Sequence, residues 1–116
     1  MHTGDILERE APPFVDWWGG GSLDGMIRSM DLVLAHINDS TVVVPGHGTT
    51  TNRAGVLHYR AMLVLVRDTL TTGFAAGKTI DDIVAQRPLA AYESELHGPR
   101  WIATFLRRVA LGMGRR

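Results

Sequence analysis

Residues 41–48 read Thr-Val-Val-Val-Pro-Gly-His-Gly, a β-branched run that ends in a histidine flanked by glycines. The run predicts a buried strand over 41–44, and Pro-Gly-His-Gly predicts a tight loop at its carboxyl end. Residues His2 to Leu7 predict the end of another strand, with Asp5 directly after Gly4. Because ligands gather at the carboxyl ends of strands in open α/β folds, Asp5 and His47 are the first candidate site residues.

Helical patterns follow both predicted strands. Ser22 is a good N-cap for an amphipathic helix over 23–37, and Asn52 caps a helix that runs to about Phe74. Thr79 caps a short helix over 80–86, and a last helix covers about 99–111. About four helices with two or three short strands predict an α/β fold. Two strands alone make a poor sheet, so part of the sheet is expected to come from elsewhere.

In two of these helices, the residue pattern predicts which surfaces are buried and which are exposed. Residues 61–66 are apolar on all sides of the second helix, so we expect more than one layer to cover them. The second helix also carries arginines at seven-residue intervals, which predict an outer face: Arg53, Arg60 and Arg67. The last helix is expected to bury an apolar stripe made of Trp101, Ile102, Phe105, Leu106 and Val109.

Composition excludes several classes of partner and site. Lys+Arg and Asp+Glu balance at 12 each, which removes the electrostatic argument for nucleic acid or an anionic membrane. The sequence contains no cysteine, so a metal site must use histidine and carboxylate ligands. The longest apolar run, 61–66, is too short to span a bilayer, and the first residues lack the features of a signal peptide. We therefore expect a cytoplasmic protein without nucleic acid or membrane partners.

Asp5 and His47 form a plausible ligand pair for zinc, manganese or iron. His2 lies near Asp5 and could join such a site. The alternative interpretation is purely local, with Asp5 in an Asx turn and His47 satisfying backbone groups of its loop. The remaining histidines are interpreted as structural, solvated or turn residues: His36, His58 and His97.

The order of these motifs resembles the second half of metallo-β-lactamase-fold enzymes, including glyoxalase II. The resemblance rests on His-Thr-Gly-Asp-Ile-Leu at 2–7, the amphipathic helix, the valine-rich strand, Pro-Gly-His-Gly at 45–48 and the following Asn-Arg-Ala helix start. It covers essentially the whole chain. It implies the C-terminal half of an αββα sandwich and a dinuclear metal centre, in which Asp5 matches the bridging carboxylate and His47 the last histidine ligand. The position of His2 is usually not a ligand in that family.

The chain also departs from the family pattern. The His-x-His-x-Asp-His cluster and the further single histidine ligand do not occur in residues 1–116, which therefore correspond to a single partial domain. One carboxylate and one imidazole cannot hold a dinuclear centre alone. The resemblance thus implies hydrolysis of a small ester, thioester or lactam substrate only if another chain or copy completes the site. The alternative is a non-catalytic structural or interaction module.

An aromatic segment precedes the first helix. Phe14, Trp17 and Trp18 can line a substrate cleft beside Asp5, as this loop does in the resembling family. Alternatively, they cover an apolar sheet edge or an interface between copies, where tryptophan is enriched. Exposed strand edges and an uncovered core predict a homodimer or a larger oligomer.

Overall fold

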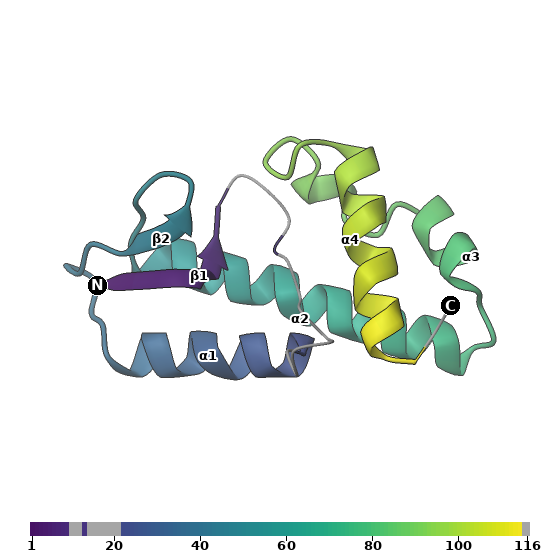
Figure 1. Cartoon of the computed structure of the whole chain (residues 1–116), viewed down its shortest axis with the longest axis horizontal. Helices are drawn as coiled ribbons and strands as arrows, with labels where there is room; N and C mark the ends of the chain where they lie inside the picture. Colours follow the sequence, from purple (N-terminus) through teal and green to yellow (C-terminus); the bar gives the residue numbers. More distant parts are fainter. Residues whose placement is uncertain (10–12, 14–21, 115–116) are drawn as a thin grey trace.

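A computed structural model describes residues 1–9, 13 and 22–114. These residues form an α/β arrangement of four α-helices, one 3₁₀ turn and a two-stranded parallel sheet. In Figure 1 the two strands lie at one end of the long helix α2, and helices α3 and α4 lie at its other end. The fold class predicted from the sequence is thereby confirmed at the level of mixed α/β.

The sheet consists of β1 (His2–Glu8) and β2 (Val44–His47). Its register pairs His2 with Val44, Gly4 with Pro45 and Glu8 with His47, with irregularities between these pairs. The strand expected at 41–44 is therefore shifted toward the C-terminus, and Pro-Gly-His belongs to the strand rather than to a loop. The reason is pairing: the Val44 N–H donates to the Met1 carbonyl, and the residues that follow continue along β1.

The residues just before β2 also differ from the expectation of a buried run. Val43 is buried and forms an isolated antiparallel bridge with Thr51, through N···O distances of 2.9 and 2.8 Å. Val42 is 61% exposed. Successive side chains of an extended segment point to opposite sides, so only one of these two valines can enter the core.

Helices α1 (Leu23–Ala35) and α2 (Arg53–Ala75) run side by side in Figure 1. Their predicted caps are present, because Ser22 accepts a hydrogen bond from the Gly25 N–H and Asn52 accepts one from the Gly55 N–H. Helix α1 ends two residues earlier than predicted. The side chains that join the two helices are apolar ones in the core and charged ones at its margin.

Two expectations about α2 are wrong. Arg60 and Arg67 do not lie on an outer face; they form ion pairs with Asp31 and Asp24 of α1, at 2.6 and 3.5 Å. The segment 61–66 is not covered on all sides, because Ala61 and Leu65 are exposed. Helix α1 packs against one side of α2, and the described residues leave another side of α2 open to solvent.

The opposite end of the molecule is helical. Helix α3 (Ile80–Ala85) begins with a capping box, in which Thr79 and Asp82 exchange side-chain to backbone hydrogen bonds. The 3₁₀ turn η1 (Ala90–Tyr92) was not expected from the sequence. Helix α4 (Pro99–Gly112) follows a turn in which His97 has a φ of 63°, which agrees with its interpretation as a turn residue.

The apolar stripe of α4 is confirmed except for its first member. Four of its residues are buried: Ile102, Phe105, Leu106 and Val109. Trp101, in the first turn of α4, is 58% exposed. Within the described ranges, no helix is long and apolar enough to cross a membrane.

Candidate functional site

Asp5 and His47 lie next to each other on the two paired strands. Asp5 is on β1 and His47 is the last residue of β2, and the distance between His47 Nδ1 and Asp5 Oδ1 is 3.4 Å. The side chains are 68% exposed for His47 and 76% exposed for Asp5. The parallel pairing of β1 with β2 thus brings together two residues that are 42 positions apart in the sequence.

Gly46 makes this close approach possible. A Cβ atom at position 46 would lie 2.2 Å from Asp5 Oδ1 and 2.8 Å from the Gly4 carbonyl carbon. Neither strand backbone can yield that space without loss of pairing, so a side chain at this position would push β1 and β2 apart. The glycine before His47 is therefore required by the geometry of the Asp5–His47 pair itself.

Arg9 holds the segment after His47. Its N–H donates to the His47 carbonyl at 3.0 Å, and its Nη1 donates to three oxygens of Thr49 and Thr50 at 2.8 to 3.2 Å. Gly48, with a φ of 93°, lies against Arg9, where a Cβ atom would come within 2.7 Å of the Arg9 carbonyl oxygen. Gly46 before His47 and the Arg9 contacts after it therefore fix the backbone that carries His47.

The spacing of the two side chains matches adjacent ligands of one metal ion. Donors that each lie about 2.1 Å from a tetrahedral zinc ion are separated from one another by about 3.4 Å. The observed Nδ1–Oδ1 distance of 3.4 Å equals that separation and is longer than an ordinary N–H···O hydrogen bond. A carboxylate and an imidazole are also the donor types that zinc, manganese and iron accept.

A complete metal site is not formed by the described part of the chain. Among residues 1–9, 13 and 22–114, no group of three or more His, Cys, Asp or Glu side chains is placed to hold a metal ion. His2 does not join Asp5 and His47, because its Nδ1 accepts a hydrogen bond from the Gly4 N–H at 3.0 Å. The other predicted site residues, Phe14, Trp17 and Trp18, lie outside the described residues.

The histidines interpreted as structural are tied to their own surroundings. His36 caps α1, and its Nδ1 lies 2.7 Å from the Leu32 carbonyl oxygen. His58 is more than a solvated helix residue, because its Nε2 lies 3.0 and 3.1 Å from the two carboxylate oxygens of Glu95. The sequence gives no signal for this pair, whose members are far apart along the chain.

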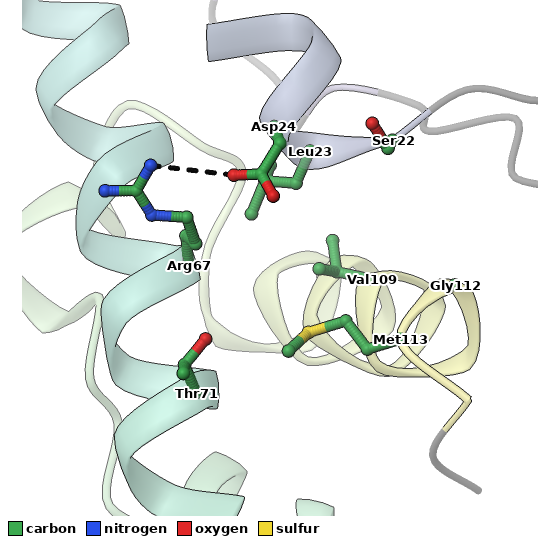
Figure 2. A pocket seen from close by; sticks show the side chains of 8 residues that line it. All are labelled: Ser22, Leu23, Asp24, Arg67, Thr71, Val109, Gly112 and Met113. Atoms are coloured by element: carbon green, nitrogen blue, oxygen red, sulfur yellow. Dashed lines mark ion pairs between the residues drawn. The ribbon is translucent and has the colours of Figure 1, made fainter.

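Two of the pockets in the described structure border charged side chains. One, of about 220 Å³, lies between α1, α2 and α4, and Figure 2 shows Arg67 reaching toward Asp24 at its edge while Val109 and Met113 project from α4. A side-chain hydrogen bond with Asp68 and the charges of Asp68 and Asp24 raise the pKa of the Arg67 guanidinium. The other, of about 440 Å³, lies between Arg9, α2 and the segment after η1.

The chain was compared with known proteins by sequence and by structure. Scans of the sequence against protein-family models, of curated proteins and of solved structures each gave no match. The resemblance to the metallo-β-lactamase fold therefore remains an expectation from the sequence motifs of this chain.

Proposed function

We propose that this chain supplies Asp5 and His47 to the metal site of a metallo-β-lactamase-like hydrolase, and that another chain or a second copy supplies the remaining ligands. The observation that carries this proposal is the Asp5–His47 pair, whose Oδ1 and Nδ1 atoms lie 3.4 Å apart on the two paired strands, next to a glycine that admits no side chain. The exposure of both side chains leaves them accessible to ligands from a partner.

The proposed site performs hydrolysis of a small ester, thioester or lactam. Zinc, or manganese or iron in its place, would supply a water of lowered pKa and stabilise the developing oxyanion. The role of Asp5 is to offset positive charge with its carboxylate, and the role of His47 is to offer a neutral imidazole nitrogen. Arg9 and Gly48 support the second role, because they fix the peptide that carries the imidazole.

Zinc binding by the purified chain tests the proposal. We expect zinc titrated into metal-free protein to bind, and Asp5→Asn and His47→Gln each to weaken the binding by about 10- to 100-fold. His36→Gln and Asp39→Asn are matched controls, because both residues are exposed and lie outside the pair. If zinc bound the Asp5 and His47 variants as tightly as the wild type, the metal proposal would be wrong, and a lack of binding to the purified wild type would exclude a site completed by a second copy.

A second candidate function is that of a self-associating structural or interaction module. Large apolar side chains are exposed around the strand end and on the neighbouring helices: Ile6, Leu32, Val42, Leu57 and Leu65. A two-stranded sheet is marginally stable in water, and contact with another copy would cover such residues. This observation favours a homodimer or a larger oligomer.

Light scattering coupled to size exclusion tests the self-association. The proposed oligomer should dissociate on dilution, and Val42→Lys should weaken it because it places a charge on an exposed apolar site. A well-folded monomer at all concentrations would exclude it. Zinc titration of the oligomer then separates the two functions, since only the metallo-hydrolase requires binding that depends on Asp5 and His47.

A further inference from the structure

We infer that the pocket between Arg9, helix α2 and the segment after η1 binds a small aromatic carboxylate. This pocket, of about 440 Å³, contains neither Asp5 nor His47. The inference therefore goes beyond the proposed metal site and holds whether or not metal binds. Its evidence is the combination of an apolar floor, an aromatic wall and a guanidinium group at one edge.

The floor of the pocket is apolar and rigidly packed. Tyr59 and Met62 of α2 and Leu96 of the segment after η1 line it, and all three are buried in the core. Ala54 and Gly55, from the first turn of α2, contribute small surfaces that leave the entrance wide. Concave sites of a few hundred Å³ with apolar walls and a few polar groups are typical of small-molecule binding.

One wall combines aromatic and polar surfaces. The rings of His58 and Tyr92 lie with their centroids 5.3 Å apart at an angle of 44°. His58 Nε2 donates to the Glu95 carboxylate at 3.0 and 3.1 Å, since a carboxylate can only accept. This hydrogen bond holds both rings in place and occupies Glu95, so the wall offers planar ring faces on which an aromatic ligand can stack.

Arg9 gives the pocket its preference for a negative charge. Its Nη1 is occupied by oxygens of Thr49 and Thr50, which anchors the guanidinium group at the edge of the pocket. Its Nε and Nη2 donate no hydrogen bond to any other residue that the structure describes. A planar guanidinium is suited to a carboxylate, which it can bind in a bidentate manner. Among the described residues that line this pocket, the one carboxylate is that of Glu95, and it is bound to His58.

A matched pair of ligands tests both halves of the inference. We would titrate 1-naphthylacetate and its uncharged analogue 1-naphthylacetamide into the full chain, in buffer with EDTA so that no metal contributes. Amide chemical shifts would report the location of binding, which we expect at Gly55, Tyr59 and Leu96. The acid should bind roughly tenfold more tightly than the amide, because a charged hydrogen bond to Arg9 is available to the acid alone.

Four variants separate specific binding from non-specific binding. Ala54→Trp should abolish binding of both ligands, because the new ring would fill the pocket from an exposed helix position. Ala61→Trp adds the same ring to an exposed position of α2 outside the pocket and should leave binding unchanged. Arg9→Gln should reduce the affinity for the acid to that of the amide, whereas Arg53→Gln should preserve the difference.

Several results would overturn the inference. Equal affinity for acid and amide would exclude the role of Arg9, and unchanged binding to Ala54→Trp would exclude this pocket. Shifts elsewhere, or no shifts with either ligand, would likewise exclude it. Because EDTA removes metal from every measurement, these outcomes are independent of the zinc titration of Asp5 and His47.

Discussion

The two ends of helix α2 differ in how their surfaces are used. At the helical end, α3 and α4 bury most of their large apolar side chains, with Trp101 as an exposed exception, and a capping box satisfies backbone groups at the start of α3. At the strand end, Ile6 of β1 and Val42, which precedes β2, are exposed, and the polar pair Asp5–His47 lies open to solvent. The apolar side chains of the helical end are thus largely covered by packing within the chain. The strand end carries the features of a surface that another molecule covers.

This difference separates the residues that maintain the fold from those that are free for function. The helical end obtains its stability from side-chain packing in a common core. The strand end obtains its geometry from close backbone approach, in which Gly46 is the contact point. Substitutions at the helical end should therefore lower stability through lost packing. Those at the strand end should lower it through disturbed strand pairing.

The largest expected effect is the loss of a core side chain. Leu70→Ala removes a fully buried leucine of α2 and should lower the free energy of unfolding by about 2–5 kcal/mol. Val42→Ala at the strand end should change it by no more than about 0.5 kcal/mol, because Val42 is exposed. Urea denaturation of both variants checks the contrast. Equal losses would show that the strand end is packed as tightly as the helical end.

A methyl group at position 46 should have a smaller effect on stability and a larger one on function. Gly46→Ala should lower the free energy of unfolding by about 1–3 kcal/mol, because the added carbon meets strand backbone. It should also weaken zinc binding, since Asp5 and His47 can no longer hold their spacing. Gly25→Ala, whose nearest contact would be Ser22 Oγ at 3.1 Å, is the control and should leave zinc binding unchanged. Unaltered zinc affinity in Gly46→Ala would contradict the proposed geometry.

The cap of α3 provides a third, intermediate effect. Thr79→Ala removes the side-chain acceptor of the capping box and should cost about 1 kcal/mol of unfolding free energy. Thr72→Ala, in the interior of α2, should cost nothing, because alanine is the stronger helix former. Thermal unfolding distinguishes the two. A cost for both variants would point to a general effect of losing threonine rather than to the cap.

The smallest expected effect concerns the pH dependence of the same capping box. The hydrogen bond from the Thr79 N–H lowers the pKa of Asp82 in the folded state. A lowered carboxylate pKa contributes stability that is present above the unfolded pKa and lost as pH falls through the folded pKa. Wild type should therefore exceed Asp82→Asn in stability at neutral pH, and the difference should shrink from about pH 5 downward. A difference independent of pH would show that the charge of Asp82 makes no contribution.

Local patterns predicted much of this fold. Ser22, Asn52 and Thr79 are caps in the structure, because capping depends only on a few neighbouring residues. The sequence predicted that Asp5 follows the end of a strand, whereas the structure places it in the middle of β1, where pairing with β2 brings it close to His47. The register of β2 was not predictable, since it depends on pairing with β1 and not on the β-branched run itself.

Local sequence patterns did not predict the contacts between residues that are far apart in the sequence. The seven-residue spacing of the arginines indicated one helix face, but only the position of α1 decides that Arg60 meets Asp31. The same holds for His58 and Glu95, whose contact depends on how η1 folds back over α2. The pocket they line could not be inferred from the sequence for that reason.

Pro45 has a consequence for how the sheet can grow. Val44 directs its N–H toward β1, so alternation along the strand turns the backbone nitrogen of the next residue to the outer edge of β2, where proline has no hydrogen to donate. Thr51 already occupies that edge at Val43. Both features close β2 to further strands, so any strand offered by a second copy or another chain must add along β1, which carries Asp5. Extension of the sheet would then bring the added strand directly beside the Asp5–His47 pair.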